Sequence, residues 1–223
     1  MSEALLPFVE VNTNDNPTAC VIWMHGLGDS GHGFSPIVPE LNLPDSLGIR
    51  FIFPHAPTRT VTINNNMKMP AWYDIKSLDF NSRADLSGVE ESAASIKAIF
   101  DAQVKAGIAP DKIVLAGFSQ GGVIAYHLGL RLQHKIAGIM ALSTYMCEPD
   151  LLNEQASGEN RQVPIFIAHG TQDPVVPPVL GEMAYKTLQD AGYKPEFHEY
   201  PMQHNVCMKE LEDISAWLQQ QLA

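Results

Sequence analysis

Residues Ile113 to Gly122 read Ile-Val-Leu-Ala-Gly-Phe-Ser-Gln-Gly-Gly, the most informative stretch of this chain. Its first four residues form an apolar run typical of a buried strand, and a segment able to form a helix begins at Val123. Between them, Gly117-x-Ser119-x-Gly121 predicts a sharp turn from strand to helix with the serine at its apex. Both glycines fit such a turn because a Cβ at either position would strike a neighbouring element. The serine hydroxyl is therefore expected to stand clear of a sheet, above the positive end of the next helix.

Strands and helices alternate along the rest of the chain. Apolar runs predict strands at residues 5–11, 19–24, 50–53, 112–116, 136–142, 163–168 and 195–200. Helical periodicity predicts helices at residues 86–104, at 120–132, between Pro178 and Gly192, and from residue 205 onward. A capping box of Ser87 and Glu90 is expected to begin the first of these helices. This alternation predicts an α/β fold with a mainly parallel sheet, built as one domain over residues 1–223.

Composition and charge exclude several classes of protein. The 223 residues include 14 Lys and Arg against 25 Asp and Glu, a formal net charge of −11, which argues against a nucleic-acid partner. The chain shows no signal-peptide pattern and no run of about 18 apolar residues that could span a bilayer. Its cysteines, Cys20, Cys147 and Cys207, lack the spacing of metal ligands and are expected to be free thiols. A cytoplasmic protein without a metal ion or a cofactor is therefore expected.

A serine at such a turn becomes a nucleophile only with an imidazole to accept its proton and a carboxylate to orient the imidazole. In folds with this turn, the acid and then the histidine follow the serine at the ends of later strands. Asp173 follows the strand predicted at 163–168, and His204 follows the strand predicted at 195–200. We therefore expect Ser119, Asp173 and His204 to form a catalytic triad. Structural or solvent-facing roles are expected for the other candidates, Asp150, Asp190, His127, His134, His169 and His198.

The tetrahedral intermediate of such a reaction needs two preorganised N–H donors for its oxyanion. Gln120 follows the serine directly and is expected to supply one of them. Leu27, in the loop after an early strand, is expected to supply the other, because Gly26 and Gly28 let its backbone turn inward.

The same loop also matches a dinucleotide-binding pattern, Gly26-x-Gly28-x-x-Gly31. That pattern requires an acidic residue at the end of the next strand to bind a ribose hydroxyl. The next strand instead ends at Phe53-Pro54, so nucleotide binding is not expected.

Six ordered motifs carry a resemblance to a known family. They are residues 25–29, 54–57, 69–74, 117–122, 169–177 and the turn of His204. Over nearly the whole chain they resemble the acyl-protein thioesterase/carboxylesterase family, also called the phospholipase/carboxylesterase family. The resemblance implies a compact α/β-hydrolase without a large cap domain, with the triad and the oxyanion donors named above. It also implies cofactor-free hydrolysis of carboxylic esters, lysophospholipids or S-acyl cysteine thioesters, and a homodimer.

Two long segments, residues 54–82 and 143–162, resist a periodic assignment. The first contains Met67, Met69 and Trp72, whose apolar side chains are expected to form a mobile wall of the acyl site and to contact a membrane transiently when open. The alternative is that these side chains simply cover the core. The second segment is expected to be a solvated surface loop.

One residue departs from the family pattern. Tyr145 stands where tryptophan is common in acyl-protein thioesterases, and its hydroxyl would alter the acyl channel. Broad carboxylesterase activity on acyl esters or thioesters is therefore the main expectation. The alternative is a catalytically silent binding protein of the same fold, against which the complete Ser-Asp-His set argues.

Overall fold

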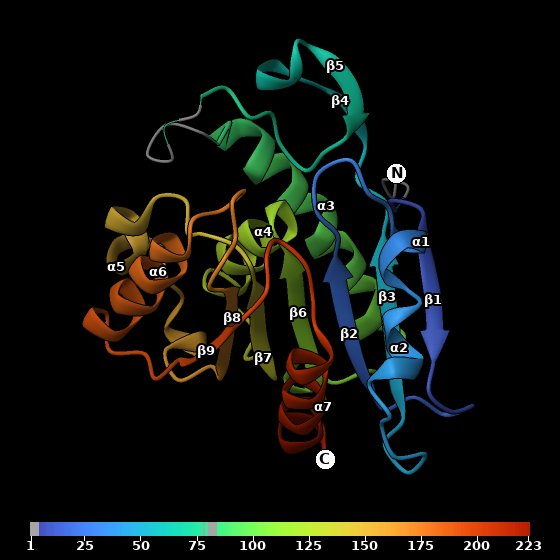
Figure 1. The fold of residues 1–223 in the computed structure, drawn as a ribbon. Helices are drawn as coiled ribbons and strands as arrows, with labels where there is room; N and C mark the ends of the chain where they lie inside the picture. Colours follow the sequence, from blue (N-terminus) through green and yellow to red (C-terminus); the bar gives the residue numbers. More distant parts are fainter. Residues whose placement is uncertain (1–4, 78, 80–83) are drawn as a thin grey trace.

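The computed structural model describes residues 5–77, 79 and 84–223 (Figure 1). Within these residues, seven strands form one sheet in the order β1-β3-β2-β6-β7-β8-β9. They are β1 (Phe8–Asn12), β2 (Ala19–Met24), β3 (Ile49–Pro54), β6 (Ile113–Phe118), β7 (Gly138–Leu142), β8 (Ile165–Gly170) and β9 (Glu196–Tyr200). Strand β1 runs antiparallel to β3, and the other neighbours pair in parallel. The predicted α/β fold with a mainly parallel sheet is confirmed.

Helices cover both faces of this sheet and bury two apolar layers (Figure 1). One face packs against α3 (Leu86–Lys105), α4 (Gln120–Gly129) and α6 (Pro178–Asp190). The other packs against α1 (Gly31–Phe34), α2 (Ile37–Glu40) and α7 (Met208–Leu222). Because both faces are covered, strands β2, β6 and β8 are buried along their whole length, which explains their uninterrupted apolar sequences.

Helix α3 starts where it was predicted to start, but its N-cap residue differs from the prediction. The helix begins at Leu86 with Asp85 as its N-cap residue, so the expected capping box of Ser87 and Glu90 is wrong. The backbone N–H of Asp85 donates to Asp74, and the Asp85 carboxylate accepts from Lys76 at 2.7 Å. These contacts fix the entry into the helix two residues before Ser87.

The segment 54–82 contains a β-hairpin that sequence periodicity did not reveal. Strands β4 (Thr58–Val61) and β5 (Met67–Pro70) pair antiparallel, joined by the 3₁₀ turn η1 (Thr62–Asn64), and extend beyond the main sheet in Figure 1. Each strand has only four residues and a largely exposed face, which is too short for a clear alternation. Residues 78 and 80–82 of this segment lie outside the described residues.

The segment 143–162 is more ordered than a solvated loop. It forms η3 (Pro149–Leu151), α5 (Leu152–Gln155) and η4 (Gly158–Asn160). The buried amide of Asn160 donates to the carbonyl groups of Leu132 and His134 and accepts the N–H of Ile136. This amide ties the segment to the end of the α4 region. A further short turn, η2 (Pro110–Lys112), leads into β6.

None of the helices within the described residues has the length and apolar character to cross a membrane.

Candidate active site

Ser119 stands in the turn between β6 and α4 with a strained backbone. Its φ is 53° and its ψ is −118°, a region that residues with a Cβ rarely adopt. A Cβ on Gly117 would lie 2.1 Å from the Gly121 backbone, and one on Gly121 would lie 2.2 Å from the Met24 carbonyl oxygen. The strand, turn and helix expected around the serine are therefore present, and both glycines are required by close backbone approach.

Asp173 and His204 lie in contact at the ends of β8 and β9. The Nδ1 atom of His204 is 2.6 Å from Oδ2 of Asp173, whose side chain is fully buried. The other carboxylate oxygen accepts the backbone N–H groups of Val175 and Val176 at 2.8 and 2.9 Å, so the acid is held in one orientation. With Nδ1 engaged, Nε2 is the imidazole nitrogen left for a reacting group.

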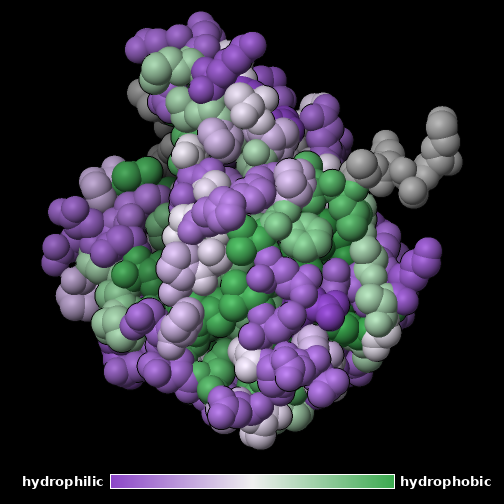
Figure 2. All heavy atoms as spheres, turned by 90° about the vertical axis from the view of Figure 1, so that its right-hand side faces the viewer, coloured by the Kyte–Doolittle hydropathy of each residue, from purple (hydrophilic) through white to green (hydrophobic). Residues whose placement is uncertain are grey.

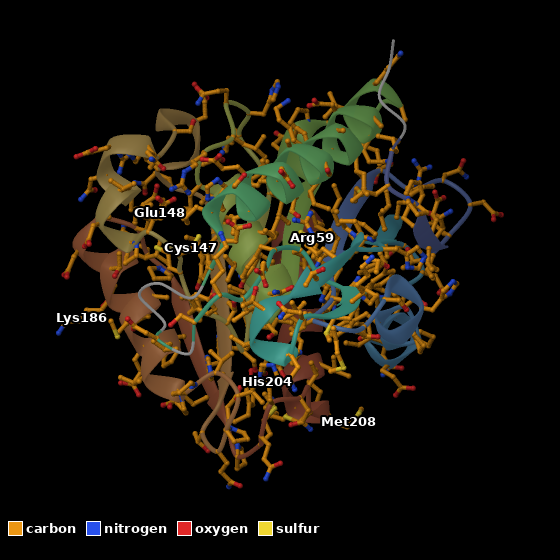
Figure 3. The ribbon with its side chains drawn as sticks, turned by 90° about the horizontal axis from the view of Figure 1, so that it is seen from above. Arg59, Cys147, Glu148, Lys186, His204 and Met208 are labelled. Carbon is orange, nitrogen blue, oxygen red and sulfur yellow. The ribbon has the colours of Figure 1, made fainter. Side chains whose placement is uncertain are left out.

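Ser119 and His204 line the same cavity, which measures about 320 Å³. Its lining includes both residues together with Leu27, Gln120, Tyr73 and Tyr145. Figure 3 looks down on this edge of the sheet and shows His204 on the side of Met208, away from Cys147 and Glu148. The structure thus brings the expected nucleophile, base and both expected oxyanion donors to one place, with Asp173 behind the base.

Three residues expected at the acyl site are not among the residues that line this cavity. Met67 is 55% exposed on β5, and Met69 is partly buried with its sulfur beside the Asn64 amide. Trp72 is completely buried. From the same segment, Tyr73 and Ile75 reach the cavity instead, so the segment contributes a wall through different side chains.

A brace of four hydrogen bonds joins the two residues expected to bind the oxyanion. The indole N–H of Trp72 donates to the His25 carbonyl at 2.8 Å, and the Trp72 backbone N–H donates to the Gln120 side chain at 3.0 Å. The same amide of Gln120 donates to the Tyr73 carbonyl at 2.9 Å, and the Gly28 N–H donates to Pro70 at 2.8 Å. Residues 70–73 therefore connect the Leu27 loop to the turn after Ser119.

Two buried histidines hold the loops of the site and were not expected to react. His25 donates from Nδ1 to the Gly26 carbonyl at 2.7 Å and accepts the Ala56 N–H at Nε2. His169 donates from Nε2 to the Val176 carbonyl at 2.9 Å, next to the Asp173 turn. Burial lowers the pKa of both imidazoles and favours their neutral forms, whose tautomers follow from these hydrogen bonds.

The remaining histidine and acid candidates do not line the cavity of Ser119. His198 stacks on Phe166 with ring centroids 4.6 Å apart, and His134 lies 5.9 Å from the Phe100 ring. Burial lowers the pKa of His127 to about 4. Asp150 lines a different cavity, and Asp190 is the last residue of α6.

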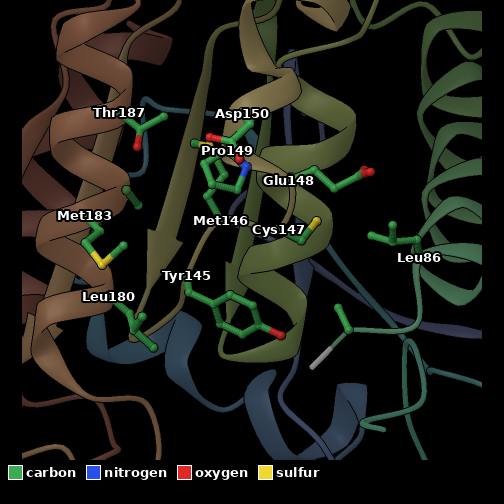
Figure 4. Close-up of a pocket in the computed structure, with 12 residues that line it drawn as sticks. Leu86, Tyr145, Met146, Cys147, Glu148, Pro149, Asp150, Leu180, Met183 and Thr187 are labelled. Carbon is green, nitrogen blue, oxygen red and sulfur yellow. The ribbon is translucent and has the colours of Figure 1, made fainter. Parts of the chain in front are cut away.

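That different cavity, of about 340 Å³, lies beyond Tyr145 (Figure 4). Leu180 and Met183 of α6 form one side, with Leu86 and Cys147 opposite them. Tyr145 lines both cavities, and its hydroxyl lies 3.0 Å from the hydroxyl of Tyr73. The tyrosine pair therefore stands at the boundary between them.

The cysteines Cys20, Cys147 and Cys207 are all free thiols. Burial raises the pKa of the Cys20 and Cys147 thiols to about 12, so neither is a thiolate at neutral pH. Across the described part of the chain, no cluster of three or more His, Cys, Asp or Glu side chains has the arrangement of a metal site.

Comparisons with known proteins agree on one family. A family model described as Phospholipase/Carboxylesterase matches residues 7–222. Acyl-protein thioesterase 1 of Neurospora crassa is 40% identical over 214 residues, which cover 92% of this chain and 87% of that protein. Acyl-protein thioesterase 1 of Cryptococcus neoformans var. neoformans is 37% identical over 236 residues, or 97% of this chain and 98% of the relative.

Solved structures show the same similarity. Arabidopsis thaliana SOBER1 superposes with a TM-score of 0.86 at 31% identity, over 92% of this chain and 99% of that chain. Zea mays acyl-protein thioesterase 2 gives a TM-score of 0.86 at 25% identity, over 98% of this chain and 100% of that chain.

Proposed function

The chain belongs to the phospholipase/carboxylesterase family of α/β-hydrolases, and from this we propose that it is a serine hydrolase of acyl esters and thioesters. The contact of 2.6 Å between Asp173 and His204, beside the cavity that His204 shares with Ser119, carries the proposal. We assign Ser119, His204 and Asp173 as nucleophile, base and orienting acid of a single domain.

The first half of the reaction transfers the acyl group to the enzyme. The hydroxyl oxygen of Ser119 attacks the carbonyl carbon while its proton passes to Nε2 of His204. Asp173 holds the proton on Nδ1 and stabilises the imidazolium that forms. The carbonyl oxygen becomes an oxyanion and accepts the N–H groups of Leu27 and Gln120. The imidazolium then donates its proton to the departing alcohol or thiol as the bond to the acyl carbon breaks.

The second half releases the acid. A water molecule gives one proton to Nε2 of His204, and its oxygen attacks the acyl carbon. The same two N–H donors stabilise the second oxyanion. When this intermediate collapses, the proton returns to Ser119 and the carboxylic acid leaves.

The finer features of this proposal rest on the relatives and on residue chemistry. Relatives named acyl-protein thioesterase favour a thioester substrate, whereas Tyr145 in the cavity lining favours a broader carboxylesterase. Activity on lysophospholipids is proposed from the family alone. The free thiols agree with a cytoplasmic location. We also propose that the chain forms a homodimer. The segment 54–82, which exposes Met67, is proposed to contact a membrane transiently.

Labelling with a fluorophosphonate probe tests the assignment. The purified chain should become covalently labelled at Ser119, as identified by mass spectrometry of the modified peptide, and Ser119→Ala should remain unlabelled. A butyrate oxygen ester and the matched thioester should then both be hydrolysed. The ratio of their kcat/KM values gives the preference between oxygen esters and thioesters. A folded protein that neither reacts with the probe nor cleaves either substrate would instead be the silent binding protein.

A further inference from the structure

A third cavity also has His204 in its lining but does not include Ser119, Leu27 or Tyr145. It measures about 350 Å³ and shares His204 and Phe118 with the cavity of Ser119. The rest of its lining comes from the α1–α2 region and the start of α7, namely Gly33, Phe34, Ile37, Asn205, Val206 and Leu211. Figure 2 faces the side of the molecule that carries α1 and α2 and shows apolar side chains gathered there at the surface.

The chemistry of the proposed reaction requires space beside His204 for the leaving group. Because Nδ1 is engaged by Asp173, the departing oxygen or sulfur must receive its proton from Nε2 and must lie within about 3 Å of it. Ser119, the expected oxyanion donor Leu27 and Tyr145 line one cavity, and we assign the acyl group to it. The cavity that contains His204 without Ser119 remains for the leaving group.

The lining of this third cavity is mostly apolar and, among the described residues, includes no Asp, Glu, Lys or Arg. The Phe118 ring lies 4.7 Å from the His204 ring and 5.5 Å from the Phe34 ring, which gives a continuous apolar floor leading away from the base. Ile37 and Val206 are half-buried and complete the walls. Apart from His204, the only polar side chain in this lining is the amide of Asn205. A charged group placed here would lose hydration and would find only the Asn205 amide and the His204 ring as polar partners.

We propose that this cavity binds the leaving group, and that it selects esters and thioesters whose alcohol or thiol portion is uncharged and apolar next to the scissile bond. The inference rests on the proposed function, since it assigns one side of the same reaction centre. A small apolar alcohol and the apolar residue beside an acylated cysteine share this chemistry.

Esters with one acyl group and different leaving groups test the proposal. Butyrate esters of ethanol, butanol and hexanol should show kcat/KM rising about two- to four-fold per added CH₂ until the cavity is filled. A butyrate ester of a hydroxy acid, which places a carboxylate in the cavity, should be at least ten-fold poorer than the uncharged ester of equal length. Butyryl thioesters of short cysteine peptides test whether the leaving group can be a peptide. If it can, the peptide with Leu beside the cysteine should have a higher kcat/KM than the peptide with Asp there. Equal values for the two peptides would restrict the cavity to small alcohols.

Two variants test whether the effect arises in this cavity. Ile37→Gln should flatten the dependence of kcat/KM on alcohol length and keep its dependence on acyl length. Val206→Thr keeps the side-chain volume and should have the same effect to a smaller degree. The loss should fall on acylation, measured as the burst phase with a chromogenic ester, because the alcohol departs before deacylation. Val179→Gln changes an equally apolar but exposed residue of α6 and should leave both series as in the unmodified chain.

Failure of the inference and failure of the function are separable. If the chain hydrolyses butyrate esters at rates independent of alcohol length, or if Ile37→Gln weakens the acyl and alcohol series equally, the cavity does not bind the leaving group. If Ile37→Gln does not fold, Val206→Thr decides between these outcomes. A chain that is not labelled at Ser119 loses the proposed function itself.

Discussion

Ser119 combines a positive φ with the N-cap position of α4, and both features suit the proposed nucleophile. Ser119→Ala should lower kcat by about four to six orders of magnitude, because the residual rate comes from binding and the oxyanion donors alone. His204→Ala should lower kcat by about as much, since the serine and the histidine act together in the same step. Steady-state kinetics with a butyrate ester measures both. A Ser119→Ala protein that retains a tenth of the activity would place the nucleophile elsewhere.

Trp72 should act as a positioning residue for the oxyanion, although it does not line the cavity. Trp72→Phe removes the indole N–H that holds the His25 carbonyl and keeps most of the buried ring. We expect kcat to fall about ten-fold with little change in KM, because a displaced donor weakens the transition state more than the bound substrate.

Trp23 offers a matched control for this variant. It is equally buried, and its indole N–H has no hydrogen-bond partner among the described residues. Trp23→Phe should therefore leave kcat close to that of the unmodified chain. Equal losses of kcat in both variants would show that Trp72 contributes packing alone.

For single residues, the sequence offered clearer grounds for proposing reacting groups than for proposing the residues that support them. Ser119, Asp173 and His204 could be proposed because their chemistry and chain order are restrictive, and the structure brings them together. The brace through Trp72 and the Gln120 amide could not, because a tryptophan in an apolar segment reads equally well as core or as an acyl wall. One signal was present in Asp173-Pro174, since an aspartate in a turn often accepts the N–H groups that follow it, as Asp173 does here.

Among the elements, the loop that carries Tyr145 should set the acyl chain length. Tyr145→Ala would remove the side chain between cavities of about 320 and 340 Å³ and its contact with Tyr73. Long acyl esters should gain relative to short ones, by up to about four-fold in kcat/KM for each CH₂ that enters the second cavity. A series of p-nitrophenyl esters from acetate to palmitate measures this.

Met67→Asp provides the comparison on the hairpin. The Met67 side chain is exposed and outside both cavities, so its replacement should leave the chain-length series unchanged in the absence of lipid. A flattened series in Met67→Asp would instead show that β5 closes over the acyl chain during turnover.

The degree of burial explains which strands could be predicted from the sequence. Strands β2, β6 and β8 are buried on both faces, so their residues are uniformly apolar and easily recognised. Strands β4 and β5 pair only with each other, and four residues such as Thr58–Val61 carry too little pattern. The beginning of α3 at Leu86 was predicted, but its capping residues were not, because the contacts of Asp85 with Asp74 and Lys76 decide the N-cap.

For the whole molecule, the acid Glu210 should make stability depend on pH. Its carboxylate is fully buried in the first turn of α7, and neither oxygen has a well-aligned hydrogen-bond partner among the described residues. Burial raises its pKa from 4.5 to about 8, with the Cys207 backbone opposing the shift. The folded chain therefore keeps this proton over a range in which the unfolded chain has lost it.

The contribution of Glu210 is fully favourable below pH 4.5 and is lost as the pH rises toward about 8. Glu210→Gln should remove this dependence and raise the free energy of unfolding at pH 9 by on the order of a few kcal/mol. Urea denaturation at pH 5, 7 and 9 measures the difference. A constant gap between the two proteins at all three values would contradict the buried, protonated acid.

The hairpin β4–β5 extends away from the sheet, yet its last residue, Pro70, accepts the Gly28 N–H beside the expected oxyanion donor Leu27. A ligand that binds the exposed hairpin could therefore displace the Leu27 loop without entering the cavity. A nanobody that binds Thr58–Val61 and twists the hairpin would slow the enzyme without entering the cavity, lowering kcat while KM stays constant. Such inhibition would act on a hairpin outside the cavity of Ser119 and would therefore not depend on the triad chemistry that serine hydrolases share.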